Sequence, residues 1–396
     1  MSKGVVHILF LWGLPAVCVV LFIAYSALQP VVNYAEAPLF DGNAYLAIYD
    51  FLKGNATEYE VAFPFHSRVL VPWLATSVPV ANPLVAFQYV NLFFMVLAVL
   101  LLYRLWYRLA LAPYLVVLGM CWLLLHWTGL VRLNVFDPIT VDVPLYAFQA
   151  LFLLIVYHRK WLHLLWLGPL ATVHKESFPA LLVLLLCFAV GYRWLKKDRH
   201  TYNIGMIALA LVLSVVAKYV ANAFFVPATP GHSSVVTVAW HLREVWYDPF
   251  RLVRWLAAIF VAYGAMLWLP LALVKQKPAI EPFTVLLALF SLLYFFFGIA
   301  AGGDMLRIVF LGFPFVFTLI LKLATHLKAI AVVWAGVMSL PLMRLRQLIP
   351  EPAANRAAWQ LWYPEFTSAT LVWVYIGYGL LSLAVMLVVY RKYRVL

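Results

Sequence analysis

The chain has 396 residues, of which 66% are hydrophobic and only 11% are charged, and its mean hydropathy is +0.96. These values lie far outside the range of soluble globular domains and exclude an ordinary soluble enzyme. The net charge of +13 would suggest a nucleic-acid partner in a soluble chain. Here the placement of Lys and Arg indicates a membrane topology instead, and we expect no nucleic-acid partner.

Apolar runs of about 20 residues recur along the chain, the length at which a helix crosses a bilayer core of about 30 Å. The sequence therefore predicts an all-α, polytopic membrane protein with a single transmembrane domain over residues 1–396 and no large soluble domain. Including two short segments, 161–173 and 178–192, we expect about 12 membrane segments. The full-length spans are expected near residues 5–28, 84–103, 112–130, 139–157, 203–225, 253–274, 283–301, 305–324, 328–343 and 367–390.

The first run is too long for the apolar region of a signal peptide, about 7–15 residues, so we expect it to be a membrane span. Cys18, Cys121 and Cys187 all fall within apolar runs, and no disulfide or metal framework is predicted. Lys218 lies inside the span 203–225, where we expect its side chain to snorkel to the interface or to pair.

The positive charges predict the orientation. With the N-terminus in the cytoplasm, more than half of the 28 Lys and Arg fall on that side, mostly in short loops, together with only two acids, Asp198 and Glu281. This holds only if 161–192 forms two short helices divided at His174-Lys175-Glu176, because a single span would invert every later loop. Both termini are then expected in the cytoplasm of a bacterial inner-membrane protein. The charged turn is expected to face protein or a water-filled cavity.

The long loops, 29–83, 226–252 and 344–366, are all expected on the outer, periplasmic face, which favours chemistry on that side. The first of them begins with the stretch Leu39-Phe40-Asp41-Gly42-Asn43-Ala44-Tyr45. An acid at this boundary can meet both a lipid-borne and a soluble reactant, although Asp41 can equally be a solvated acid or a helix cap. Gly42 permits close backbone approach, and the segment 45–52 has the spacing of an amphipathic helix.

Other charged residues are expected at the same depth. Arg68 is either an interfacial anchor or a site cation, held in a stiff segment between Pro64 and Pro72. Asp137 and Asp142 open the span 139–157, where one of them can cap the helix. We expect Asp142 to lie about a turn inside that run, where capping explains it less well.

Lys175 and Glu176 are opposite charges between two short membrane helices, and such residues are functional candidates unless they simply pair with each other. Asp304 and Arg307 lie one helical turn apart and can also pair. Arg243, in loop 226–252, is a site cation or a solvated one. Charged residues from at least five segments are thus expected at the outer boundary, which favours a catalytic site there.

In these motifs the chain resembles the GT-C glycosyltransferases, polytopic enzymes that move a sugar from a polyprenyl-phosphate carrier on the non-cytoplasmic face. Phe40-Asp41-Gly42-x-x-Tyr45 resembles the first-loop acid of that superfamily, and Arg68-Val-Leu-Val-Pro72 is similar to its R-x-L-x-P pattern. Lys175-Glu176-Ser177 and Gly303-Asp304-x-x-Arg307 resemble later signatures. The sequence has no paired first-loop acid and no D-x-E metal site, so no cofactor is predicted and metal dependence stays open.

The resemblance implies inverting transfer with Asp41 as general base. It implies a polyprenyl-phosphate-linked sugar as donor, a glycan or lipid-linked acceptor, and membrane lipids as partners. Arg68, Lys175, Arg243 and Arg307 are candidates for holding the donor phosphate. The other residues expected at this site are Tyr45, Asp137, Asp142, Glu176 and Asp304.

Two other classes fit the composition: a secondary transporter, and another lipid-linked transferase or polymerase of the cell envelope. Transporters tend to place their sites near the bilayer midplane between internal repeats. In this sequence the charges gather at one face and no repeat is evident, which favours the transferase.

Overall fold

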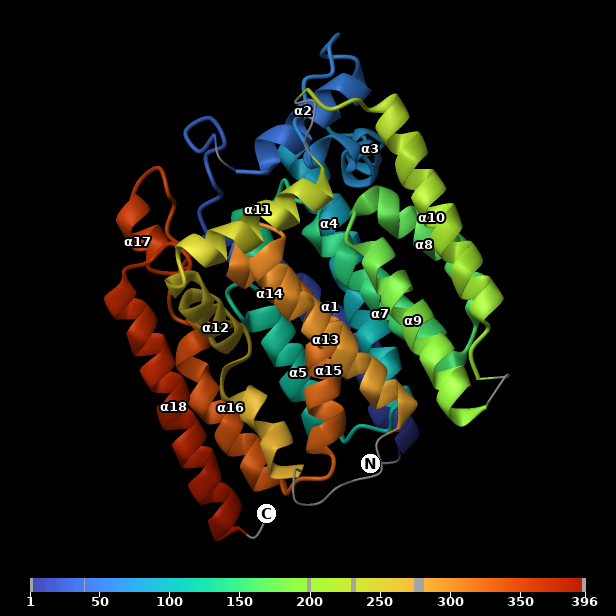
Figure 1. Ribbon diagram of the computed structural model, residues 1–396. Coiled ribbons are helices and arrows are strands. Elements are labelled where there is room, and N and C mark those ends of the chain that lie inside the picture. Colours follow the sequence, from blue (N-terminus) through green and yellow to red (C-terminus); the bar gives the residue numbers. More distant parts are fainter. Residues whose placement is uncertain (1–2, 39, 198–200, 229–232, 274–280, 394–396) are drawn as a thin grey trace. The chain divides into compact units, whose positions relative to one another are not determined.

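The computed structural model describes residues 3–38, 40–197, 201–228, 233–273 and 281–393 (Figure 1). Every regular element in these ranges is helical and none is a strand, which confirms the all-α prediction. Seven of the described helices are long and apolar enough to cross a membrane, or eight if one bent pair counts as a single span. The protein is therefore a polytopic helical membrane protein, and the larger number of about 12 segments stays a prediction.

The chain divides into two compact units, each assembled from stretches that are far apart in the sequence. Unit 1 consists of residues 1–33, 106–136 and 234–396, and unit 2 consists of residues 34–105 and 137–233. The expected single domain over residues 1–396 stays a prediction.

Unit 1 contains most of the membrane helices. Its elements are α1 (Lys3–Leu28), α5 (Pro113–Leu125), α6 (Arg132–Phe136), α11 (Ser234–Tyr247), α12 (Phe250–Tyr263), η3 (Gly264–Leu273), α13 (Pro282–Ala300), α14 (Met305–Leu311), α15 (Phe313–Ala324), α16 (Ala329–Met343), α17 (Arg356–Gln360) and α18 (Ala369–Lys392).

Two predicted spans of unit 1 are broken. The run 253–274 changes from α12 to the 3₁₀ helix η3 at Gly264, whose φ of 57° favours glycine and whose added Cβ would lie 2.5 Å from Oγ of Ser339. The run 305–324 bends by 60° between α14 and α15. Gly312 packs there against Tyr294, and a proline at the start of α15 suits its first turn.

Unit 2 contains α2 (Gly42–Lys53), η1 (Phe65–Ser67), α3 (Leu70–Thr76), most of α4 (Pro83–Arg108), α7 (Asp142–His158), η2 (Trp161–His163), α8 (Leu164–His174), α9 (Phe178–Lys196) and α10 (Ile204–Phe224). The predicted division of 161–192 is confirmed, because α8 ends at His174 and α9 begins at Phe178. The predicted helical segment 45–52 is also confirmed and forms the body of α2.

Close packing of small residues joins α8 to α10, which run side by side (Figure 1). A Cβ added at Gly168 would lie 2.6 Å from Oγ of Ser214, so only glycine allows this approach. Thr172 and Ser214 donate their hydroxyl hydrogens to carbonyls one turn earlier in their own helices, which satisfies both buried groups. Small residues at such contacts are typical of helix pairs in membranes. The turn that carries Lys175 and Glu176 directly follows this packed helix α8.

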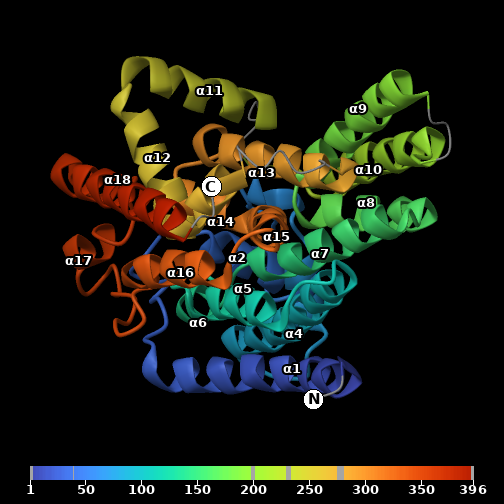
Figure 2. The ribbon, with the colours of Figure 1, turned by 90° about the horizontal axis from the view of Figure 1, so that it is seen from below.

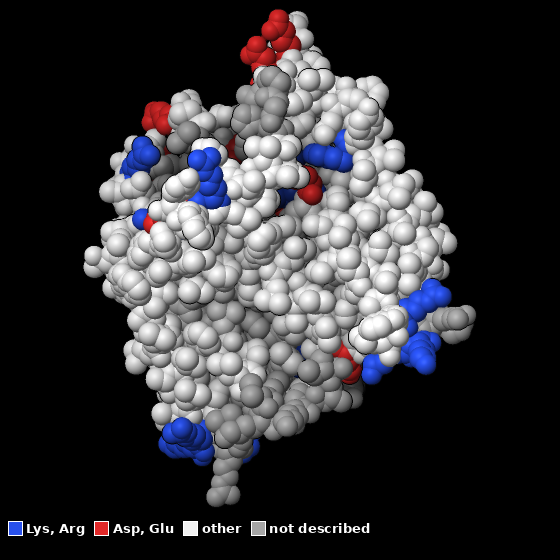
Figure 3. Space-filling view, viewed as in Figure 1, with Lys and Arg blue, Asp and Glu red and all other residues white. Residues whose placement is uncertain are grey.

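Charged side chains cover little of the surface. On the face shown in Figure 3, Lys, Arg, Asp and Glu occupy small areas, and most of the described surface is uncharged. Large apolar side chains are widely exposed instead, for example Trp12 at 73% and Leu213 at 36%. Such a surface is unfavourable in water and suits contact with lipid chains.

Candidate functional site

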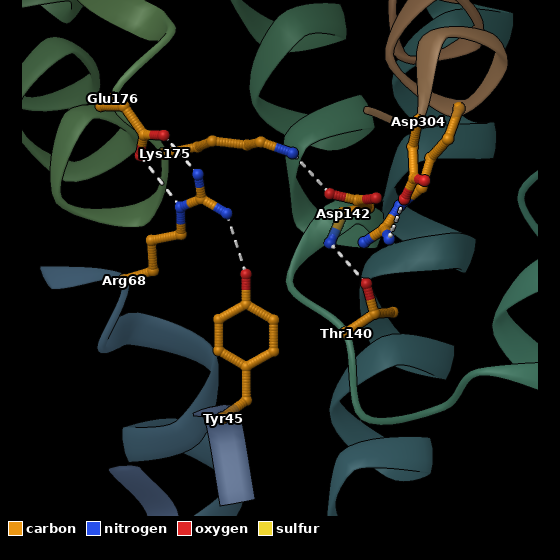
Figure 4. A network of polar contacts seen from close by, with 8 residues as sticks. Tyr45, Arg68, Thr140, Asp142, Lys175, Glu176 and Asp304 are labelled. Carbon is orange, nitrogen blue, oxygen red and sulfur yellow. Dashed lines mark hydrogen bonds and ion pairs between the residues drawn. The ribbon is translucent and has the colours of Figure 1, made fainter. Parts of the chain in front are cut away.

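The charged residues of unit 2 meet at Arg68, which follows η1 and is only 8% exposed. Its Nε donates a hydrogen bond of 2.9 Å to Oε2 of Glu176, and its Nη2 donates to Oε1 of the same carboxylate. Its Nη1 donates to the hydroxyl oxygen of Tyr45 over 3.0 Å (Figure 4). One guanidinium therefore ties α2 to the turn between α8 and α9 and brings together three residues, Arg68, Glu176 and Tyr45, that the sequence singled out.

The electrostatics of this group favour a fixed ion pair. Burial alone would raise the pKa of Glu176, but the charge and hydrogen bonds of Arg68 outweigh it and lower the pKa to about 2. Burial raises the pKa of Tyr45 despite the nearby guanidinium. At neutral pH the carboxylate is therefore ionised and the phenol is neutral.

Lys175 and Glu176 do not pair with each other, so the reading of a self-contained ion pair is wrong. Nζ of Lys175 lies 2.6 Å from Oδ1 of Asp142, while Glu176 pairs with Arg68 (Figure 4). The extended backbone at Lys175, with φ −153° and ψ 128°, separates the two side chains because consecutive residues of an extended chain point to opposite sides. Lys175 thus binds the start of α7, while its neighbour Glu176 binds Arg68.

Asp142 is the first residue of α7. The sequence had suggested that it lies about a turn inside the span, and this expectation was wrong. Residues 137–141, between α6 and α7, are not helical. This agrees with the restriction that Pro138 places on the backbone of Asp137. Pro144 is tolerated in the first turn of α7, where a backbone N–H has no helical partner. A carboxylate at this helix N-terminus is favoured by the helix dipole in addition to Lys175.

Asp41 occupies the N-cap position of α2, but its side chain makes no capping hydrogen bond. Asp41 therefore stands at the cap position that the sequence allowed, without a side-chain capping hydrogen bond. It is half-buried and precedes Tyr45 by about one helical turn, so the contact between Tyr45 and Arg68 fixes the end of the helix that carries it.

Tyr34 contacts both Gly42 and Asp137, and these contacts account for the roles of the two residues. A Cβ added at Gly42 would lie 2.2 Å from Cε1 of the Tyr34 ring, so the close approach predicted at Gly42 is made by this ring. The hydroxyl of Tyr34 donates to Oδ1 of Asp137 over 2.6 Å and accepts from the backbone N–H of Ile139 over 3.0 Å. Asp137 thus holds the ring that covers the start of α2.

His66 and Ser67 also contribute polar contacts, although the sequence did not single them out. Nζ of Lys218, on α10, donates a hydrogen bond to Oγ of Ser67. Nε2 of His66 lies 3.2 Å from Oδ1 of Asn222, also on α10. The only signal in the sequence was their position directly before Arg68.

The other predicted residues belong to unit 1. Nη1 of Arg307 lies 3.5 Å from Oδ2 of Asp304, so the predicted pairing of these two is confirmed. Arg243 is exposed on α11, with its guanidinium 5.3 Å from the centre of the Tyr247 ring, one turn further along. That these three residues share a site with Arg68 stays a prediction.

Unit 1 also holds a buried acid that the sequence did not single out. Glu365 is 7% exposed, and its Oε1 accepts a hydrogen bond of 3.1 Å from the backbone N–H of Leu306. Its Oε2 is buried and has no hydrogen-bond partner among the described residues. Burial, and then the charge of Asp304, raise the pKa of Glu365 to about 8.

Within the described ranges, no group of three or more His, Cys, Asp or Glu side chains is placed to hold a metal ion. No family model, curated protein or solved structure matches the chain. The contacts described above are therefore the basis for inferring a function.

Proposed function

We propose that the protein is a glycosyltransferase of the GT-C type. It would move a sugar from a polyprenyl-phosphate carrier to an acceptor hydroxyl on the periplasmic face of a bacterial inner membrane. The observation that carries the proposal is the link from Tyr45 through Arg68 to Glu176, because it fixes the helix headed by Asp41 against the charged turn between α8 and α9.

The chemistry requires a base and a site for a departing phosphate. The acceptor oxygen attacks the anomeric carbon of the donor while the bond from that carbon to the phosphate oxygen breaks. The proton of the acceptor hydroxyl passes to a carboxylate, and the electron pair of the broken bond leaves on the polyprenyl phosphate. A single positioned base suffices for this inverting transfer, and nearby cations stabilise the charge that develops on the phosphate.

Asp41 is the proposed base. Its side chain is not used to cap α2, and its helix is held by the hydrogen bond between Tyr45 and Arg68. Arg68 itself is engaged through Nε, Nη1 and Nη2 with Glu176 and Tyr45, so we assign it a positioning role. Lys175 is the proposed phosphate-binding cation of unit 2, because an ammonium has three donors and can hold Asp142 and a phosphate oxygen together.

The test is transfer from a synthetic polyprenyl-phosphate sugar by the purified protein, tried with a panel of sugars. Asp41→Asn keeps the shape of the side chain and removes its basicity, so we expect turnover to fall by a factor on the order of 10²–10⁴ with unchanged thermal stability. Asp50→Asn is the matched control, since Asp50 lies on the same helix and contacts Asn55. Activity that survives in Asp41→Asn would remove the base from the proposal.

A transporter gives the opposite result in a second assay. If the wild-type protein consumes no lipid-linked sugar from the panel but moves a solute across liposome membranes, the proposal of a transferase is wrong. The polar contacts of unit 2 would then belong to a translocation pathway, because charged pairs within transporters serve as such sites.

A further inference from the structure

A cavity of about 670 Å³ lies within unit 1, between the end of α16, the start of α18 and the loop 344–366. Helices α12, α16 and α18 pack against one another around it (Figures 1 and 2). Its volume is within the range of ligand sites, about 300–1,000 Å³. The cavity takes no part in the proposed transfer, and its walls come from two candidate membrane spans and their connecting segments.

The cavity has one cation in its wall. Among the described residues that line it, Arg344 is the only charged one. Nη2 of Arg344 donates to the carbonyl oxygen of Leu361 over 2.9 Å and to the hydroxyl of Tyr375 over 2.6 Å. The guanidinium also lies 4.5 Å from the centre of the Trp362 ring. Among the described residues no carboxylate pairs with Arg344, and none offers an acceptor to its Nε or Nη1.

A buried arginine, Arg132, adds positive charge next to Arg344. Arg132 is fully buried and donates to the carbonyl oxygens of Met343 over 2.8 Å and Arg344 over 3.1 Å, and also to that of Gln347. The carbonyls that end α16 would otherwise favour a cation beside them, and Arg132 already uses them. Within the described part of unit 1, Arg132 has no carboxylate partner either. The end of the cavity is therefore positively charged and suited to an anion.

The remaining walls are mostly apolar, with Gln347 and two tyrosines among them, and are open towards the exterior. Val374, Leu361 and Leu348 line the cavity and remain 57%, 49% and 43% exposed. An apolar channel with a cation at one end matches an amphiphile that has a chain and an anionic head. Because a single guanidinium faces the cavity, a phosphodiester with one negative charge balances it, whereas a phosphate monoester carries about −1.5 to −2 charges at neutral pH.

We propose that this cavity binds an anionic phospholipid of the surrounding bilayer, with its phosphodiester on Arg344 and one acyl chain between α12, α16 and α18. Arginine binds phosphate oxygens through charge-assisted hydrogen bonds, and Nε and Nη1 of Arg344 remain as donors for single bonds of this kind. The bound lipid joins the end of α16 to the start of α18 and so stabilises this part of unit 1.

The experiment measures binding of phosphatidylglycerol to the delipidated full-length protein by native mass spectrometry, together with its thermal stability. Phosphatidylcholine with the same chains tests the need for net negative charge. We expect phosphatidylglycerol to bind and to raise the melting temperature, and phosphatidylcholine to do neither. Arg344→Gln should weaken phosphatidylglycerol binding by at least about tenfold, the effect of one lost charge-assisted contact. Arg346→Gln is the matched control, since Arg346 is exposed and does not line the cavity.

A second variant tests the chain site without touching the cation, in case Arg344→Gln does not fold. Val374→Trp places a large ring in the cavity and should abolish the stabilisation by phosphatidylglycerol, whereas Val388→Trp, exposed on the same helix outside the lining, should not. Equal stabilisation by both lipids, or an equal loss in Arg346→Gln, would overturn the proposal. So would tighter binding of a polyprenyl phosphate than of phosphatidylglycerol at the site that Val374→Trp blocks.

Discussion

Glu176 accepts two hydrogen bonds from the same guanidinium, one from Nε of Arg68 over 2.9 Å and one from Nη2. This bidentate pair is buried on the Arg68 side, where the side chain is 9% exposed, and more open at Glu176, at 20%. The remaining nitrogen of the guanidinium holds Tyr45. The planar fork of arginine is required for all three contacts, and a single ammonium cannot reproduce them.

Arg68→Lys should therefore destabilise the protein although it keeps the charge. We expect a loss of about 1–3 kcal/mol in the free energy of unfolding, because the contact to Tyr45 and one contact to Glu176 disappear. Denaturant titration of the protein in micelles measures this. A double-mutant cycle with Glu176→Gln should show strong coupling. Additive effects would mean that the pair does not act as a unit.

Gly42→Ala should also destabilise unit 2. The new Cβ would lie 2.2 Å from the Tyr34 ring, and that ring is anchored by its hydroxyl on Asp137 and by the N–H of Ile139. Overpacking of this kind costs about 1–3 kcal/mol, even though alanine favours helices.

Gly191→Ala is the control for that variant, since nothing lies within 4 Å of its added Cβ on α9. The double variant Gly42→Ala with Tyr34→Ala should lose less stability than the sum of the single changes, because the clash is relieved. If Gly42→Ala proves neutral, the contact with Tyr34 does not constrain α2.

The helices followed from the sequence because apolar runs and charged breaks record where a chain can cross a membrane. The division between α8 and α9 at Lys175 and Glu176 was predicted from the charge distribution alone and is confirmed. The break at Gly264 was not predicted, since it depends on the approach of Ser339, which lies 75 positions further along the chain. A distant contact of this kind leaves no local pattern.

The residues of the polar contacts in unit 2 were named from the sequence, but their partners were not. Arg68, Glu176, Lys175 and Asp142 were all expected to be functional, and the structure brings them together in unit 2. The sequence left open that the adjacent charges Lys175 and Glu176 pair with each other. Extended backbone directs them apart, and this conformation cannot be read from residue types alone.

Glu365 should make the stability of the protein dependent on pH. Its pKa is about 8 in the folded protein against an ordinary value of 4.5. Because the folded pKa is the higher one, the folded state holds the proton more tightly. The contribution of Glu365 to stability is then fully present below pH 4.5 and is lost as the pH rises to about 8.

Glu365→Gln keeps an acceptor for the N–H of Leu306 and cannot ionise. We expect the variant to gain stability relative to the wild type as the pH rises from 5 to 8, the window given by the pKa of Glu365. Thermal unfolding of both proteins at a series of pH values measures the difference, and the titration of groups that the two proteins share cancels. A difference that stays constant across this window would contradict a raised pKa at Glu365.

The orientation in the membrane is tested by labelling of single cysteines in a background without Cys18, Cys121 and Cys187. Asn55 and Lys197 are both exposed, so a cysteine at either position is accessible to a reagent on its own side. An impermeant thiol reagent added outside should label Asn55→Cys, because the first long loop is expected on the outer face, and should label Lys197→Cys only after permeabilisation. The result for Lys197→Cys depends on the break between α8 and α9, because a single span over 161–192 would place Lys197 outside. Labelling of Lys197→Cys in intact cells would therefore invert every later loop, and with it the proposed periplasmic placement of Arg243, Asp304 and Arg307.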